Sequence, residues 1–512
     1  MLSKDVRASL VIKKLRYYAR YIVVCLLLKR IKLVEDLVRE FSQSLNDYSH
    51  VYEPEAQLEW SLVLQEIKAF IDAESIVAVV TGQNHPDGPG IQLTLSQRLS
   101  STNTPPPLHM PSGKYFLSEA IIVGNYHRQV KFSELSIDMY RLLQILEREP
   151  NEQQEQQLAQ QQQQQQKQQA NVSPNHQAYG SSSAQGKPFN LLARPTFNNS
   201  QQGGAKGSPH KYLLFRPTFS QLFLFLASGF KELPQNGVIL LYFSAEGSFG
   251  HMTADGEEAG YDLGGVATNP TIGSNNTLAG QLGNTTSGQQ NRSQMSSTRN
   301  RHQALTASST GASGGMRASQ SMHFKQLNCL HPGDLYLFTR KPMVLIVDSN
   351  NSYAFQHMPR HFGLPLLVLM SPTEYPPPFN DNTKGSLFTL FLHCPLTALC
   401  CISHIIELPE TIWRDAQVYL DKFYTETGQI ILQSRLLDPS FISFCSDDFL
   451  RLLIFRFIFC FMIMRLHRLF RTSSYYPRSY PPLPESELLQ HPGLKKIISD
   501  LTVTMDIRTL FD

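Results

Sequence analysis

The sequence predicts an α/β fold with large helical parts: N-terminal helices, a central mainly parallel sheet covered by helices, and a C-terminal helical region. Short runs of consecutive apolar residues predict strands that are buried on both faces, which is typical of parallel sheets. Longer segments carry apolar residues at helical spacing. Two polar, low-complexity segments interrupt the 512-residue chain, and we predict that they are disordered insertions.

Helical periodicity dominates the first part of the chain. Apolar residues recur at helical spacing in residues 5–48 and again in residues 55–72. The apolar run 21–28 also admits a secretory signal peptide, but basic residues follow it directly where a small-residue cleavage site would be needed. We therefore expect residues 1–75 to form an N-terminal helical region.

The clearest α/β pattern lies in residues 322–384. The apolar run 342–347 predicts one strand, and residues 364–370 predict another. Between them we expect a helix over 349–362, which Pro359 should end or kink. Two such strands joined by a helical crossover favour a parallel sheet covered by helices.

Two earlier stretches, 76–149 and 210–265, complete the predicted α/β core. Both combine short apolar runs with helical periodicity. We expect strands at 76–80, 121–123 and 238–243, and helices at 132–146 and 219–233.

The two insertions differ sharply from the rest of the chain in composition. Residues 150–209 hold a glutamine tract followed by Ser, Asn, Gly and Pro, and residues 266–321 are rich in Gly, Ser, Thr and Asn. Neither segment holds enough apolar residues to offset the entropy of ordering its backbone.

From residue 385 to residue 512 the pattern is almost purely helical. Pro409 stands where a first-turn proline would stand, ahead of apolar residues at helical spacing. We expect one long apolar helix over 438–471 and a last helix over 485–510.

Composition excludes some classes of protein. Lys+Arg 45 against Asp+Glu 42 gives a net charge of +3, which provides no global electrostatic attraction to nucleic acid. The seven cysteines are odd in number, lie mostly in apolar runs and show no framework spacing. The cysteines are therefore more typical of a protein in a reducing compartment than of a secreted protein.

Asp348 is the strongest candidate for a catalytic residue, because it ends a predicted parallel strand where α/β enzymes place metal or phosphate ligands. The following residues do not complete an Asp-x-Ser-x-Ser cation motif, since Asn350 occupies the third position. We favour a structural role, in which Asp348, Ser349 or Asn350 caps the following helix. An α/β enzyme that uses Asp348 remains an alternative.

Other motifs give weaker signals. The set from His393-Cys394 through Cys400-Cys401 to His404 holds metal-ligand residue types, but adjacent cysteines in a helix point in different directions. The glycines in 180–186 and 247–256 lack the spacing of phosphate-binding loops, and Gly-x-Ser-x-Gly does not occur. We therefore expect no catalytic residue, no metal and no cofactor.

A single membrane span is the main rival interpretation. Residues 385–406 contain no Asp, Glu, Lys or Arg and are long enough to cross a bilayer. Pro395 and two histidines interrupt the run, so we favour a buried core helix. In the second apolar run we expect Arg451, Arg456 and Arg465 to snorkel or to pair on one side of a buried helix.

A small basic cluster lies near the N-terminus, formed by Lys13, Lys14, Arg16 and Arg20. It could contact phosphates or serve as a nuclear address. We expect a solvated helix face, which is the commoner reason for such a cluster.

Several long segments resemble the suppressor of cancer cell invasion family. The collinear segments are VKFSELSIDMYRLLQILEREP (130–150), HKYLLFRPTFSQLFLFLASGFKELP (210–234), CLHPGDLYLFTRKPMVLIV (329–347), GSLFTLFL (385–392), DFLRLLIFRFIFC (448–460) and residues 476–484.

The resemblance implies a regulatory protein of the nucleus and cytoplasm. Family members are transcriptional cofactors that bind the myocardin-related coactivator of serum response factor and so restrain Rho–actin signalling and cell migration. They are also linked to DNA double-strand-break repair through a p53-binding protein on chromatin. The resemblance carries no catalytic residue, and we expect no direct sequence-specific binding to DNA.

Overall fold

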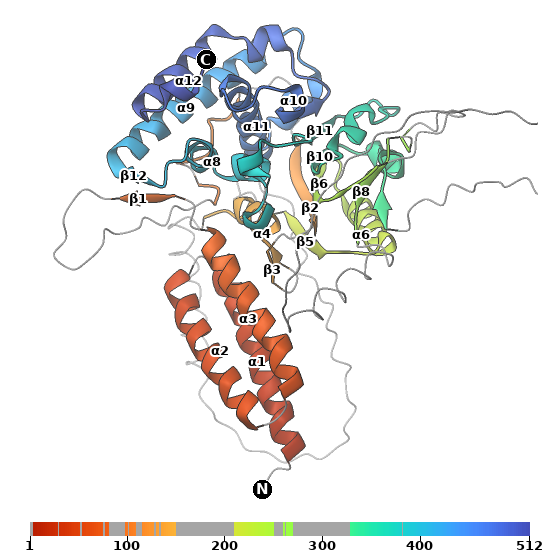
Figure 1. Cartoon of the computed structure of the whole chain (residues 1–512). Helices are drawn as coiled ribbons and strands as arrows, with labels where there is room; N and C mark the ends of the chain where they lie inside the picture. Colours follow the sequence, from red (N-terminus) through yellow and green to blue (C-terminus); the bar gives the residue numbers. More distant parts are fainter. Residues whose placement is uncertain are drawn as a thin grey trace, which may run out of the picture.

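Three N-terminal helices project from a body that holds the sheet and the C-terminal helices (Figure 1). The computed structural model describes residues 4–28, 30–51, 54–74, 77–80, 98–100, 102–108, 115–126, 130–132, 135–149, 209–249, 260–261, 263–269, 328–380 and 382–512. The observed architecture confirms the predicted α/β fold class. Nearly all of the two predicted insertions lies outside the described residues.

The N-terminal region consists of α1 (Lys4–Leu27), α2 (Ile31–Val51) and α3 (Pro54–Glu74). The helical pattern predicted for 5–48 is therefore two helices, α1 packing on α2 and α2 on α3. The apolar run 21–28 contributes Ile22, Cys25 and Leu26 to the core of this bundle. Burial of facing apolar stripes makes the hairpin more stable than one continuous helix.

The bundle is attached to the body through α3 and α4 (Ile137–Leu146). The rings of Phe70 and Tyr140 meet edge to face with centroids 5.0 Å apart. The Tyr140 hydroxyl also donates a hydrogen bond to the carbonyl of Leu26 at the end of α1. These contacts lie within one apolar cluster, so the bundle and α4 share a core.

The central sheet has six strands in the order β13-β11-β10-β6-β2-β5. The five strands from β11 to β5 are parallel, and β13 is antiparallel to β11. The predicted strands 121–123, 238–243, 342–347 and 364–370 correspond to four of these strands. The bounds are β2 (Phe116–Asn125), β5 (His210–Phe215), β6 (Gly237–Ala245), β10 (Met343–Asp348), β11 (Leu366–Met370) and β13 (Arg478–Tyr480).

Alternate residues of each strand face two separate apolar clusters, which explains why the strand sequences are apolar throughout. On β10, Val344 and Ile346 face the cluster shared with the C-terminal helices, whereas Leu345 and Val347 face the other cluster. The second cluster is covered by α6 (Phe219–Glu232), η2 (Pro332–Arg340) and η3 (Ser352–His357). The helix predicted at 219–233 is confirmed as α6.

The connection between β10 and β11 differs from the prediction. Instead of an α-helix over 349–362, the chain forms the short 3-10 helix η3. Pro359 follows it closely and cannot continue a helix. The parallel pairing of β10 with β11 is nevertheless as predicted.

Smaller strands lie outside the main sheet. The predicted strand 76–80 is β1, which pairs with β12 rather than with the central sheet. The start of the predicted insertion 266–321 is structured, because residues 266 and 267 belong to β8. The bounds are β1 (Ala78–Val80), β12 (Glu407–Pro409), β3 (Lys131–Phe132), β4 (Leu135–Ser136), β7 (Gly247–Ser248), β8 (Gly265–Ala267) and β9 (Cys329–Leu330). The region predicted as helical over 132–146 thus begins with strands, and only α4 is helical.

The segment 385–406, which the sequence left open as a membrane span, folds as two short helices, α7 (Leu387–His393) and α8 (Pro395–Ile402). Pro395 opens α8, and the chain turns at Cys394 because this proline cannot continue α7. No helix within the described ranges combines the length and the apolarity that a membrane span requires.

The C-terminal region is helical, as predicted, but the helix expected over 438–471 is divided. The Asp447 carboxylate accepts hydrogen bonds from the backbone N–H groups of Phe449 and Leu450, and so starts a new helix. The helix expected over 485–510 is also interrupted, by the step from η7 to α12. The bounds are α9 (Glu410–Gln433), α10 (Pro439–Phe444), α11 (Asp448–Leu466), η7 (Glu485–Leu489) and α12 (Pro492–Thr504).

The three arginines of α11 do not share one side of the helix, contrary to the prediction. Arg451 donates to the carbonyls of Cys445 and Pro105 and pairs with Asp448. Arg456 instead donates to carbonyls at the end of α7, while Arg465 pairs with Glu485 at the surface. Each arginine thus ties α11 to a different neighbour.

Replacing a buried arginine should cost much more than replacing an exposed one on the same helix. We expect Arg451→Leu to lower the free energy of unfolding by about 3 kcal/mol or more, because it leaves buried carbonyls without donors. Arg465→Leu, the matched control, should change it by at most about 0.5–1 kcal/mol. Urea denaturation measures both, and equal losses would contradict the assignment of Arg451 as a buried clamp.

Candidate interaction surface and the sealed edge of the sheet

Asp348, the candidate catalytic residue, lies at the carboxyl end of β10 and is buried under α7. Its Oδ2 accepts a hydrogen bond of 2.6 Å from the Thr389 hydroxyl. The Tyr242 hydroxyl lies 2.8 Å from the same Thr389 oxygen. The favoured helix-cap interpretation is wrong, because Asp348 bonds to α7 and η3 begins without a side-chain cap.

A second buried carboxylate, Asp138 at the start of α4, lies beside Asp348. It accepts hydrogen bonds from the Ser386 backbone N–H at 3.1 and 3.0 Å and from the Ser244 hydroxyl at 3.2 Å. Arg141, one turn further along α4, pairs with it at 3.5 Å. This network joins α4, the end of β6 and the start of α7.

The two buried carboxylates raise each other's cost of ionisation. Burial is the main reason that the pKa of Asp348 rises to about 7, and the negative charge of Asp138 raises it further. The pKa of Asp138 is also raised by burial, although Arg141 opposes the shift. In an enzyme, such a pair would suggest acid–base chemistry. Here both side chains are at most 2% exposed, so a substrate cannot reach them in this conformation.

The His and Cys residues that the sequence offered as metal ligands are not gathered around one point. His393 Nε2 lies 3.2 Å from Gln144 Oε1, and Cys394 Sγ lies 2.9 Å from the Thr397 hydroxyl. Burial raises the pKa of the Cys400 thiol to about 12, which keeps it protonated. Of the glycine motifs, Gly250, Gly256 and 180–186 lie outside the described residues.

Sequence reasoning missed one cluster of ligand types, because the strand register that brings it together is not visible in the sequence. On neighbouring strands Glu119 is opposite His210, whose Nδ1 lies 2.8 Å from Glu119 Oε1. Glu232, at the end of α6, brings a third ligand atom, and all three lie within 4.8 Å of one another. The close His210–Glu119 contact is an ion pair or hydrogen bond on an edge strand.

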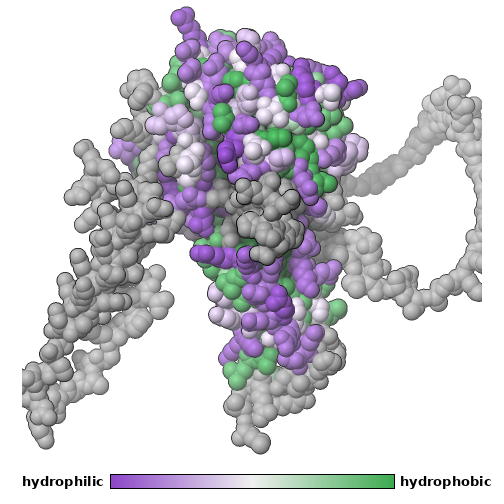
Figure 2. Space-filling view, turned by 90° about the vertical axis from the view of Figure 1, so that its left-hand side faces the viewer, coloured by the Kyte–Doolittle hydropathy of each residue, from purple (hydrophilic) through white to green (hydrophobic). Residues whose placement is uncertain are grey.

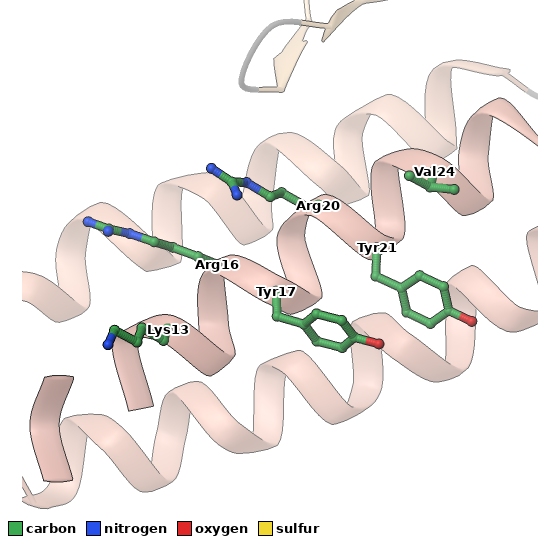
Figure 3. Close-up of a pocket in the computed structure, with 6 residues that line it drawn as sticks. All are labelled: Lys13, Arg16, Tyr17, Arg20, Tyr21 and Val24. Carbon is green, nitrogen blue, oxygen red and sulfur yellow. The ribbon is translucent and has the colours of Figure 1, made fainter. Parts of the chain in front are cut away.

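The basic cluster of α1 is exposed, as predicted, but it is part of a larger surface. Lys13, Arg16, Tyr17, Arg20, Tyr21 and Val24 line a shallow hollow on this helix (Figure 3). We call this surface the α1 face. The rings of Tyr17 and Tyr21 are stacked with centroids 5.7 Å apart, whereas Arg16 and Arg20 extend together from the helix in the opposite direction (Figure 3).

Apolar side chains continue the α1 face along the helix. The exposed ones follow one another at intervals of seven, four, three and four residues, which keeps them on one side of a helix. Tyr17, which is 61% exposed, is the most open of them. Figure 2 shows hydrophobic residues scattered among hydrophilic ones on the projecting helices. The stripe comprises Leu10, Tyr17, Tyr21, Val24 and Leu28.

The described part of the chain does not neutralise the charges of the α1 face. Among the described residues, no carboxylate forms an ion pair with Lys13, Arg16 or Arg20, and only Lys14 makes a cation–π contact, at 5.5 Å from the Tyr18 ring centre. Like charges three or four residues apart destabilise a helix by about 0.2–0.5 kcal/mol per pair. An acidic binding partner would relieve this repulsion.

The close approach of α7 to α4 requires glycine at position 385. Gly385 has a φ of +84°, and a Cβ there would lie 2.5 Å from Asp138 Oδ1 and 2.6 Å from Arg141 Nη1. We expect Gly385→Ala to lower the free energy of unfolding by about 3 kcal/mol or more. Gly363→Ala is the matched control, since Gly363 also has a positive φ but open space around it; it should cost about 1–2 kcal/mol. Similar losses in urea denaturation would show that no clash exists.

The buried carboxylate of Asp348 should make stability depend on pH. Its pKa is higher in the folded state than in the unfolded chain, so between about pH 4 and 7 the folded state holds a proton that the unfolded chain has lost. Asp348 therefore destabilises the fold as pH rises through this window, by at most about 1.4 kcal/mol per pH unit. Asp348→Asn keeps an acceptor for Thr389 and removes the charge. We expect the variant to gain stability relative to the natural chain from pH 5 to pH 8; a constant difference would contradict the raised pKa.

Comparison with known proteins identifies the family. The family model described as Protein SCAI matches residues 2–470. Protein SCAI of Homo sapiens and that of Mus musculus are each 40% identical over 511 residues, which covers 99% of this chain and 71% of either relative. The Protein SCAI homolog of Dictyostelium discoideum is 32% identical over 597 residues, covering 99% of this chain and 76% of its own length. The resemblance seen in the sequence is thus confirmed, and the chain belongs to the SCAI family.

Proposed function

We propose that this protein is a transcriptional corepressor that binds the myocardin-related coactivator of serum response factor. Binding would dampen Rho–actin-dependent transcription and restrain cell migration, in the nucleus and the cytoplasm. Membership of the SCAI family supports this proposal, together with the cofactor role that the resemblance implies.

We also propose that the protein acts by occupying a partner and not by catalysis. The observation that carries this part is the α1 face, where an aromatic stripe lies beside cations that no described carboxylate neutralises. Exposed aromatic and arginine side chains are the residue types that contribute most to protein interfaces. By contrast, the most enzyme-like pair of carboxylates is sealed inside the body.

The α1 face favours an acidic, amphipathic segment of the partner. Aspartate and glutamate side chains would pair with Lys13, Arg16 and Arg20, while apolar side chains would cover Tyr17 and Tyr21. The stripe from Leu10 to Leu28 is about 27 Å long at 1.5 Å per helical residue. A partner helix of about 18 residues would cover it.

A reporter assay tests the proposal in cells. Loss of the protein should raise the activity of a reporter driven by serum response factor, and the natural chain should restore the low level. The triple variant Lys13→Glu, Arg16→Glu, Arg20→Glu should not restore it, because it reverses the charge of the α1 face. Circular dichroism establishes that the variant is folded.

The matched control reverses three exposed lysines elsewhere on the body: Lys231, Lys495 and Lys496. It makes the same change in net charge and should restore repression. An unchanged reporter after loss of the protein would refute the corepressor role. Failure of both triple variants would instead point to net charge, and success of both would exclude the α1 face.

A pull-down tests whether the folded part of the chain is sufficient. We expect a variant that lacks residues 150–208 and 270–327, both outside the described ranges, to capture the coactivator as well as the full chain does. The same captured material can be probed for the p53-binding protein that the resemblance implies. Loss of the coactivator from the shortened chain would place the binding site in the two removed segments.

A further inference from the structure

A cavity of about 350 Å³ lies on the body, far in sequence from the α1 face. Its walls come from residues 100, 102 and 103, the α7–α8 junction, α9 and α11. Trp413, Leu420 and Tyr424 line it from one side of α9, since they are spaced by seven and four residues. Arg456 of α11 also lines it.

Arg456 brings a buried positive charge to this cavity. The side chain is only 6% exposed, and its Nη1 donates to the carbonyls of Leu392 and His393 at 3.1 and 2.6 Å. Its Nε–H has no hydrogen-bond acceptor, and no carboxylate within the described ranges lies within ion-pair distance of the guanidinium. A buried guanidinium without an anion is costly, because carbonyl dipoles replace only part of its hydration.

Tyr424 brings a second donor that has no acceptor among the described residues. The residue is 4% exposed, and its hydroxyl donates to no acceptor among the described residues, although the Arg456 side chain lies close enough to donate to the hydroxyl oxygen. Burial raises the pKa of Tyr424 to about 12, although Arg456 opposes the shift, so the hydroxyl keeps its proton and can donate. Two buried donors in one cavity, both without acceptors, call for a ligand that supplies acceptors.

We propose that this cavity binds a carboxylate, which accepts hydrogen bonds from Arg456 and from the Tyr424 hydroxyl. The indole of Trp413 and the side chain of Leu396 provide an apolar wall for the group that carries the carboxylate. This site goes beyond the proposed function and does not depend on it.

The rim of the cavity narrows the class of ligand. Glu149 and Asp421 lie among the lining residues and would repel a multiply charged anion such as phosphate. A ligand with a single carboxylate on an apolar group is compatible with the acidic rim and can pack against the apolar wall of the cavity. Such a group could belong to a small organic acid or to an acidic side chain of a bound peptide.

Fluorescence of Trp413 can report the binding. The chain has two tryptophans, so Trp60→Phe leaves Trp413 as the single reporter in the full-length protein. We would titrate this protein with benzoate, with benzamide as the neutral counterpart, with inorganic phosphate, and with a peptide rich in glutamate and leucine. Saturable quenching or enhancement by benzoate or by the peptide, without a response to benzamide or phosphate, supports the site.

The responses to benzoate and to the peptide distinguish the two sources of the carboxylate. A response to benzoate alone indicates a small organic acid, and a response to the peptide alone indicates an acidic side chain. Responses from neither probe would overturn the proposal, as would equal binding of phosphate, which would indicate a general anion site.

Tyr424→Phe is the decisive variant, because it removes only the hydroxyl. Since that hydroxyl donates to no acceptor among the described residues, the variant should change the melting temperature little, yet it should weaken binding of the active probe about tenfold. Tyr419→Phe, on the same helix but outside the cavity, should leave the affinity unchanged. Arg456→Lys keeps the charge but loses the fork of donors and should also weaken binding.

Unchanged affinity in Tyr424→Phe would overturn the proposal. A clear loss of melting temperature in that variant would overturn it too, because it would mean that the hydroxyl already donates to an acceptor inside the protein. Both measurements use the full-length chain, so neither depends on the reporter assay for corepression.

Discussion

The contact of Asp138 with the start of α7 is the interaction on which the body depends. It connects the helix that follows β2 to the first helix of the C-terminal region, across almost 250 residues of sequence. The carboxylate satisfies the Ser386 backbone N–H group, and Gly385 allows the approach because it has no side chain. The same contact fixes α7 over the carboxyl ends of the strands, which is where other α/β proteins keep a ligand site open.

The carboxyl edge of this sheet is covered by a helix, whereas α/β proteins commonly bind their ligands at the open carboxyl edge. Asp348 keeps its position at the end of a parallel strand, but its partner is Thr389 of the covering helix. The polar groups of the edge thus form hydrogen bonds between the sheet and the covering helices. Surfaces suited to partners lie elsewhere, on the projecting helices and in the cavity beside α9.

The main strands of the sheet could be predicted because a strand that is buried on both faces has a nearly continuous run of apolar residues. Every residue of β6, β10 and β11 is buried. The positions at which helices are interrupted were harder to predict. The break at Asp447 depends on a side chain that also accepts a hydrogen bond from the distant Leu117 backbone N–H. The α1 face was predicted only as a group of cations. The packing of α2 against α1 decides which tyrosines stay exposed near these cations. The spacing of residues in the sequence does not show how α2 packs. The cavity forms only when α7, α9 and α11 pack together, so no single segment of the sequence predicts it.

The pairing of β2 with β5 has a consequence for the length of the chain between them. The two strands are adjacent in the sheet, although the longest polar segment of the sequence separates them. The ion pair of Lys211 with Glu147 holds residues on the two sides of this segment close together, and lengthening a flexible connection between two such points costs the entropy of loop closure. That entropy grows with the logarithm of loop length, and doubling a flexible loop costs only about 0.6 kcal/mol. A change in the number of glutamines in the sequence should therefore have little effect on the stability of the sheet.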